Sequence, residues 1–295
     1  MTTDIEVDKA PARMVAAPSR FAMPILPALS LAVMVSLVLV ALFAPLLAPH
    51  SERHGQLQYS LEPPVFDGGT TRFLLGTDIH GRDQLSRVIY GARISVSVVV
   101  VILVFKTLIG VGLGLVAGFF GGIWDSVIMS TVDILIAFPA FLLAILMAVI
   151  FGPSFFNVIL IITLFIWPPT ARQVRVEVLA LKQQDFVTLA RCAGSPNTRI
   201  MMKHILPGVI PTVLVITTLQ VGTVILFEAA LSFLGVGIPP PAPSWGGMVS
   251  EGRAQLTSAP WLSIVPGFAI FVTVLATNTL GDWLRDRLDP RLQTL

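Results

Sequence analysis

Few side chains in this 295-residue chain could carry out chemistry, and its four histidines are the first candidates. His50 and His54 are four residues apart, a spacing that binds a metal when it lies on a helix, and His80 follows in the same polar stretch. Gly55 and the polar residues around the pair argue against a helix, and no carboxylate or thiol completes a ligand set. We therefore predict no metal site.

Motifs for catalysis or nucleotide binding are absent from the sequence. There is no Gly-x-x-x-x-Gly-Lys-Ser/Thr phosphate loop, no Gly-x-Ser-x-Gly and no His-Glu-x-x-His. The one cysteine, Cys192, excludes an internal disulfide and a thiolate metal cluster, and we interpret it as a small apolar helix residue. The sequence predicts no catalytic residue and no cofactor in this chain.

Three charged residues lie within or beside long apolar runs: Lys106, Asp133 and Glu228. An intramembrane charge is costly and usually faces a cavity or a partner. Lys106 could line a pathway and attract a carboxylate, or it could pair with a carboxylate such as Asp133, or extend to the membrane surface; we favour the last two interpretations. Asp133 and Glu228 could lie at a subunit interface or line a pathway, and the sequence leaves both open.

The composition indicates that these residues sit on membrane-spanning helices. Hydrophobic residues make up 55% of the chain and charged residues 12%, against roughly 25% charged in a soluble domain. The mean hydropathy is +0.85, and the net charge of +2 is spread along the chain, which does not suggest a nucleic-acid-binding face. Lipid is the natural solvent for so apolar a chain.

Low-charge runs predict an all-α membrane protein with six spans. The run 134–171 is too long for one helix, and Gly152, Pro153 and Ser154 divide it into a helical hairpin. The expected spans are 25–47, 94–120, the two halves of 134–171, 205–234 and 261–281. We interpret 25–47 as an uncleaved helix that follows a disordered tail, 1–24.

Lys and Arg residues are twice as frequent in the segments that would be cytoplasmic if both termini are inside. This predicts an outer loop at 48–92, a core of five spans at 93–285 and a cytoplasmic tail at 286–295. Among the inner segments is 172–206, and among the outer ones is a Pro-rich loop at 235–260.

Segment 172–206 has the pattern of a helix, a corner and a short helix. Leu179, Phe186, Ala190 and Ala193 share one helical face. Gly194 then suits a left-handed helix end, Ser195 an N-cap, and Pro196 the first turn of the next helix. Such a segment could be a plain connector or a rigid lever that docks into a soluble partner.

The same segment resembles the EAA loop of ATP-binding-cassette (ABC) importer permeases. In that frame Thr188-Leu189-Ala190 is followed at the family's spacing by Gly194 and by Leu206-Pro207. The departures are Thr188 in place of Glu, Leu189 in place of Ala, and His204 in place of Ile. The resemblance implies that the loop docks ATPase subunits through the residues that follow: Asp185, Thr188, Leu189, Ala190, Gly194, Ser195, Leu206 and Pro207.

Nearly all of the chain after residue 25 resembles the C-type permease of the dipeptide, oligopeptide and nickel branch. The resemblance rests on LLGTDIHGRDQLSRVIYGARISVSV (74–98), on the stretch 110–139, on the inner loop, on FEAALSFLGVGIPPPAPSWGGMVSEGR (227–253) and on the C-terminal GDWLRDRLDPRL. It implies a type I importer fold in the bacterial plasma membrane, a homologous second permease, and two ATPase subunits that carry ATP and Mg²⁺. It also implies an extracytoplasmic binding protein and a peptide substrate.

In the Pro-rich outer loop, consecutive prolines before Trp245 predict a stiff, extended backbone. Trp245 and Trp261 suit the membrane–water interface. In family terms Pro240, Pro241 and Trp245 could contact the binding protein.

Nickel or another small solute remains an alternative cargo. A self-sufficient secondary transporter is a second class. It would need internal repeats, or interrupted helices with charged sites at the midplane, and the sequence shows no clear repeat and only Lys106 well inside a span. An intramembrane enzyme is a third class, and it would need a paired nucleophile and base.

Overall fold

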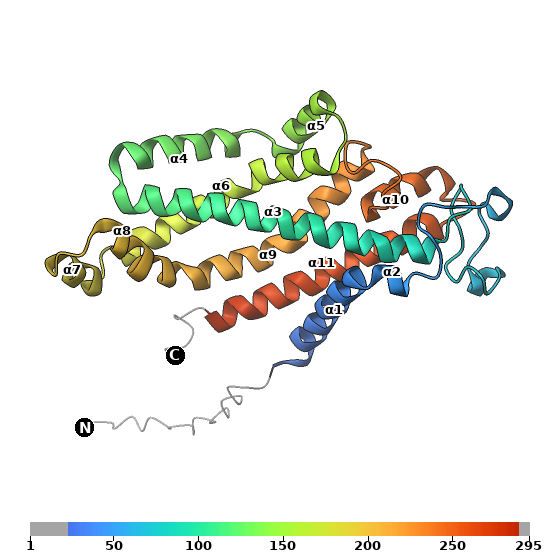
Figure 1. The fold of residues 1–295 in the computed structure, drawn as a ribbon, viewed down its shortest axis with the longest axis horizontal. Coiled ribbons are helices and arrows are strands. Elements are labelled where there is room, and N and C mark those ends of the chain that lie inside the picture. Colours follow the sequence, from blue (N-terminus) through green and yellow to red (C-terminus); the bar gives the residue numbers. More distant parts are fainter. Residues whose placement is uncertain (1–22, 289–295) are drawn as a thin grey trace, which may run out of the picture.

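The computed structural model describes residues 23–288, and there the chain folds mostly into helices (Figure 1). Within this part, extended pairing is limited to one isolated bridge between Thr77 and Asp83. The all-α prediction is confirmed. The expected tails 1–24 and 286–295 lie outside the described residues, apart from the few positions at which α1 begins and α11 ends.

Five long helices run along the molecule and are long and apolar enough to cross a membrane. These are α1 (Ile25–Leu42), α3 (Gln84–Phe120), α6 (Phe155–Leu181), α9 (Leu206–Phe233) and α11 (Trp261–Leu288). Helix α3 packs against α6 and α9, and α11 packs against α9 and α1 (Figure 1).

Shorter elements connect these helices. Near the N-terminus they are α2 (Ala44–Leu47), η1 (Leu57–Tyr59) and η2 (Val65–Asp67). In the middle they are α4 (Gly122–Ala137) and α5 (Ala140–Phe151). Beyond α6 they are α7 (Asp185–Cys192), α8 (Asn197–Ile200), the π-helical turn η3 (Met201–Ile205), α10 (Trp245–Gly252) and η4 (Arg253–Gln255).

The first half of the expected hairpin is not one straight span. Helices α4 and α5 meet at an angle of 87° across Phe138 and Pro139, and they amount to a sixth span only if the bent pair is counted as one. Phe138 has a ψ of 142° because the ring of a following proline disfavours the helical region, and Pro139 starts the new helix. The expectation of an unbroken helix from residue 134 was therefore wrong.

Two other helices extend beyond the expected spans. Helix α3 begins at Gln84 and not at residue 94. Its N-terminus is capped by Asp83, whose carboxylate accepts a hydrogen bond from the Ser86 amide at 3.0 Å. Helix α6 does not end at residue 171 but continues to Leu181, so the first part of the expected inner loop is helical.

Small residues allow α3 and α6 to approach closely. A Cβ atom on Gly114 would lie 2.6 Å from the carbonyl oxygen of Ala171, and one on Gly118 would lie 2.8 Å from Val178. Gly110 faces Thr170 in the same way. Small residues at this four-residue spacing let membrane helices approach closely, and here they bring α3 against α6.

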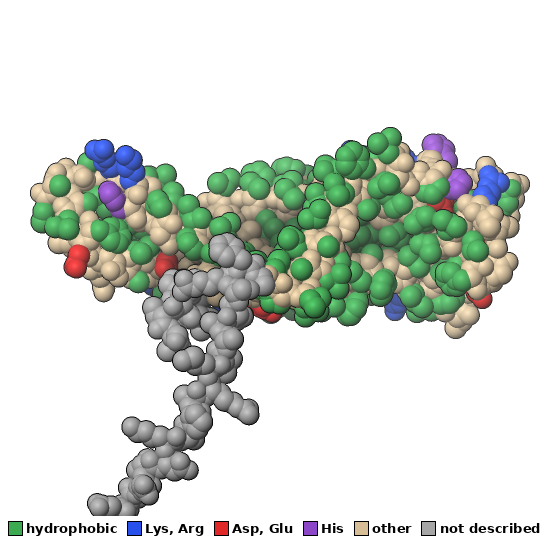
Figure 2. Space-filling model, turned by 90° about the horizontal axis from the view of Figure 1, so that it is seen from below, with side chains coloured by type: hydrophobic (Ala, Val, Ile, Leu, Met, Phe, Trp, Pro, Cys, Tyr) green, Lys and Arg blue, Asp and Glu red, His purple; other side chains and the backbone are tan. Residues whose placement is uncertain are grey.

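Hydrophobic side chains cover the middle of the molecule, and charged ones gather mainly toward its two ends (Figure 2). One end carries α7 and α8, and the other carries α2, α10 and the segment before α3 (Figure 1). We call them the α7 end and the α10 end.

Candidate functional site

The corner after α7 is a complete helix-ending motif. Gly194 has a φ of 73°, the left-handed conformation that glycine adopts without steric penalty. The Gly194 amide donates to the Arg191 carbonyl at 2.9 Å, and the Ser195 amide donates to the Ala190 carbonyl at 3.1 Å. These two bonds define a Schellman motif, so the direction in which the chain leaves α7 is fixed.

The predicted N-cap at Ser195 was wrong. Pro196 occupies the cap position of α8, with no side-chain capping bond, and Ser195 instead belongs to the end of α7, where its amide closes the Schellman motif. The predicted continuous face was also wrong, since turns at 182–184 separate Leu179 on α6 from Phe186 on α7.

One side of helix α7 packs against the rest of the chain, and the other side is exposed. Val187 is fully buried in a cluster with Ile200 and Val209, and Ala190 packs against that cluster. Leu189 points outward with 68% of its surface exposed. Phe186 and Met202 are also exposed, as are Thr188 and Asp185. The α7 end thus presents an apolar face on a rigidly held helix.

The segment after α8 enters α9 through the π-helical turn. Ile205 is fully buried in the same cluster, Leu206 packs against it, and Pro207 stands exposed in the first turn of α9. His204 is only partly buried and its ring lies 6.5 Å from that of Phe186. Ile205, one position later than the family's Ile, therefore supplies the apolar contact.

Two ion pairs tie α4 to α6 on the way to the α7 end. Arg175 donates two hydrogen bonds to Asp125, one from Nη2 at 2.6 Å, and Arg172 pairs with Asp133. The sequence did not predict either pair.

Lys106 is fully buried between α3 and α9, where Nζ donates to Gln220 Oε1 and, at 3.3 Å, to Thr217 Oγ1. No ion pair to Lys106 is found within residues 23–288. The expectation of a carboxylate partner was wrong, because Asp133 is engaged by Arg172 and amide and hydroxyl groups solvate the ammonium instead. Extension to the surface is also excluded by the burial of Lys106.

Glu228 does not lie on an exposed interface of this chain. It is buried beside Ser232, whose hydroxyl donates to Glu228 Oε1 at 2.7 Å. Asp133 remains exposed, so it alone of these two carboxylates is accessible.

The α10 end holds a buried charge network that sequence reasoning missed. Arg82 contacts Asp78 at 2.6 Å and Glu251 at 3.2 Å, and Arg87 contacts both carboxylates as well. These residues come from the segment before α3, from α3 and from α10, and the bonded pair Arg82 and Glu251 is 169 positions apart. The spacing of Asp78 and Arg82 was visible in the sequence, but nothing there pointed to Glu251.

The Pro-rich segment differs from the expected extended strut. Pro240 and Pro241 lie exposed in a turn and are joined by a cis peptide bond. Trp245 is only 2% exposed; its indole Nε1 donates to the Val88 carbonyl at 3.0 Å, and its ring fills the space over Gly91. In this position Trp245 cannot contact a partner protein, so the prediction that it contacts the binding protein was wrong.

The histidines of the segment before α3 are not on a helix. His50 lies 3.4 Å from Asp83, and His54 contacts Ser51. Within residues 23–288 no three His, Cys, Asp or Glu residues gather as metal ligands would.

Comparison with known proteins gives two family matches. Residues 110–294 match the model of the binding-protein-dependent transport system inner membrane component, and residues 26–64 match the N-terminal transmembrane domain of oligopeptide transport permease C. The chain is 40% identical over 257 residues to a glutathione transport system permease protein of Escherichia coli O6:K15:H31, covering 87% of this chain and 84% of the relative. It is 40% identical over 264 residues to a dipeptide transport system permease protein of Alkalihalophilus pseudofirmus, covering 90% and 85%.

Proposed function

Because this chain belongs to the family of binding-protein-dependent transport system inner membrane components, we propose that it is a permease subunit of an ABC importer for short peptides. Membership makes it a multi-pass inner-membrane protein that works with ATPase subunits and a binding protein. The family consists of transport permease components and not of enzymes. We propose short peptides as the transported substrate because the relatives are named for the transport of glutathione and dipeptides.

The exposed apolar face of α7 is the observation that supports a role in coupling this chain to the ATPase subunits. An apolar side chain such as Leu189 gains from burial in a partner's cleft, at roughly 25 cal/mol per Å² removed from water. The buried Val187 and the Schellman corner at Gly194 make α7 rigid, so a partner that moves α7 also moves the helices joined to it. Its proposed partners are the two ATPase subunits.

The proposed mechanism is alternating access. ATP and Mg²⁺ bind to the ATPase subunits, and this chain carries no cofactor. Their closure displaces α7, and the displacement reaches α9 through α8 and reaches α4 through α6 and the Arg175–Asp125 pair. Peptide passes between this chain and a homologous second permease, with which it forms a heterodimer.

Both termini are proposed to lie in the cytoplasm, on the side of the α7 end. The α10 end then faces outward, and the exposed Pro240 and Pro241 lie where a binding protein would land. Lipid surrounds the apolar middle, and no nucleic acid takes part.

The test is co-expression with the neighbouring transporter genes, purification through a tag on this chain, and reconstitution in liposomes. ATP hydrolysis is measured with and without the loaded binding protein. Leu189→Asp should abolish co-purification of the ATPases or the stimulated hydrolysis. The matched control is Leu57→Asp, which changes a leucine that is 76% exposed toward the opposite end. A chain that moves solute without ATPase subunits would refute the proposal and favour a secondary transporter.

A further inference from the structure

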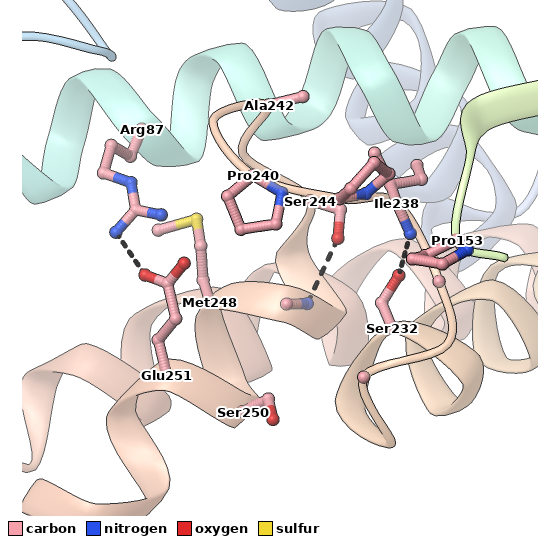
Figure 3. A pocket seen from close by; sticks show the side chains of 14 residues that line it. Arg87, Pro153, Ser232, Ile238, Pro240, Ala242, Ser244, Met248, Ser250 and Glu251 are labelled. Atoms are coloured by element: carbon pink, nitrogen blue, oxygen red, sulfur yellow. Dashed lines mark hydrogen bonds and ion pairs between the residues drawn. The ribbon is translucent and has the colours of Figure 1, made fainter.

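A cavity of about 250 Å³ lies at the α10 end, between α3, α10 and the segment that joins α9 to α10 (Figure 3). It is slightly smaller than the roughly 300–1,000 Å³ of pockets for drug-sized ligands, and thus suits a small solute. Its walls include the following residues: Arg87, Ser232, Pro240, Ser244, Met248 and Glu251.

Arg87 brings an unused hydrogen-bonding edge to this cavity. Its side chain is 3% exposed, and its Nη1 serves both Asp78 and Glu251. Its Nε is buried and has no hydrogen-bond partner in the described part of the chain. Its Nη2 takes part in no hydrogen bond with residues 23–288 and is not among the atoms sealed from solvent, so a carboxylate in the cavity can contact it directly. Nε lies on the same edge of the guanidinium but is sealed in this arrangement, so it becomes a second donor to that carboxylate only when the side chain shifts.

Glu251 brings an unused acceptor to the same cavity. Its Oε2 accepts from Arg87 at 2.8 Å and from Arg82 at 3.2 Å. Its Oε1 takes no hydrogen bond from any of residues 23–288, and Figure 3 shows the carboxylate rising from α10 toward the Arg87 guanidinium. An ammonium group beside Oε1 would find a carboxylate partner there.

Charge balance decides between kinds of ligand. Arg82 and Arg87 together cancel Asp78 and Glu251, so the network is neutral as it stands. A plain anion or cation would leave an unpaired charge in a half-buried site, which is unfavourable. The unpaired Arg87 edge disfavours a cation further.

We infer that this cavity binds a small zwitterion, whose carboxylate pairs with Arg87 and whose amino group pairs with Glu251. The hydroxyls of Ser232, Ser244 and Ser250 are already hydrogen-bonded within the chain, and the uncharged rest of the wall is mainly Gly and Pro. Recognition therefore rests on the two charged ends of the ligand and leaves its side chains free. Naming the zwitterion as a short peptide rests on the proposed function; the binding itself does not.

The test uses the assembled complex, purified through this chain in lipid nanodiscs without binding protein or ATP, and titration calorimetry. The probe is glycylglycine, compared with glycylglycine amide, which lacks the carboxylate, and N-acetylglycylglycine, which lacks the amino group. Glycylglycine should bind saturably at one site, at least tenfold more tightly than either blocked form. Equal binding of all three, or no binding of glycylglycine, would overturn the inference, while ATPase coupling at the α7 end would be unaffected.

Two variants assign the site to this cavity. Ala242→Phe places a ring in the wall without touching the charges and should weaken glycylglycine binding at least tenfold, whereas Ala28→Phe, the same change on an exposed position of α1, should alter it less than twofold. Glu251→Gln removes one negative charge and should reverse the preference toward N-acetylglycylglycine. Unchanged binding in Ala242→Phe would overturn the assignment even if Glu251→Gln does not fold.

Discussion

Arg175 on α6 and Asp125 on α4 form a two-bond ion pair between residues 50 positions apart, and Nη2 and Oδ2 lie 2.6 Å from each other. The pair lies at the start of α4, whose far end is the 87° bend at Pro139. Helix α6 leads directly to α7. Asp125 therefore couples the bent α4–α5 pair to the helix that the ATPase subunits are proposed to move.

Asp125→Asn keeps the shape of the side chain and removes its charge. Both partners are about a quarter exposed, so the stability loss should be modest, about 1 kcal/mol, equivalent to a fall of about 2–4 °C in Tm. The larger effect should be on peptide-stimulated ATP hydrolysis. A double-mutant cycle with Arg175→Gln, read by thermal unfolding and by hydrolysis, measures the coupling. Additive effects in both readouts would show that the pair transmits nothing.

Lys106→Met leaves the partly buried Gln220 without its donor and should lower stability by roughly 1–3 kcal/mol. Replacing both partners, as in Lys106→Met with Gln220→Leu, should recover most of that loss because no polar group is left unpaired. Thermal unfolding checks both variants. Transport by the stable double variant then distinguishes a structural role of Lys106 from a role in lining the pathway. If Lys106 lines the pathway, the double variant should be stable but should not transport.

Gly114→Ala and Gly112→Ala form a matched pair on α3. The added methyl at Gly114 would lie 2.6 Å from the Ala171 carbonyl oxygen, whereas at Gly112 nothing lies within 4 Å. We expect Gly114→Ala to lower Tm by several degrees and to loosen α3 from α6. Gly112→Ala should leave Tm unchanged or raise it slightly, because alanine is favoured over glycine in a helix. Equal effects at the two positions would argue against close packing there.

Gly194→Ala tests the corner after α7. Nothing lies within 4 Å of a Cβ there, so the whole effect comes from the φ of 73° and should amount to about 1–2 kcal/mol. Gly194→Asn should be milder, since asparagine tolerates the left-handed conformation. ATP hydrolysis coupled to the binding protein should fall in the order glycine, asparagine, alanine. Alanine performing as well as glycine would show that the corner need not be rigid.

Much of the fold could be read from local sequence because membrane helices satisfy their own backbone hydrogen bonds. Runs of about 20 apolar residues mark such helices whatever surrounds them. The positive φ at Gly194 and the close packing at Gly114 were also predictable, because glycine has no steric penalty in the left-handed region and no Cβ to keep two helices apart. The apolar periodicity also marked α7, although not which of its residues face outward.

Pairings between distant residues were decided only by the tertiary structure. The partners of Lys106 are neutral residues more than 100 positions away, and Asp133 is taken by Arg172. The burial of Trp245 depends on the space over Gly91, and the network around Arg87 depends on α10 folding back onto α3. A charged or aromatic side chain within an apolar run indicates that it must have a partner. Which residue becomes that partner depends on how the helices pack against one another, and the sequence of a single segment does not determine this packing.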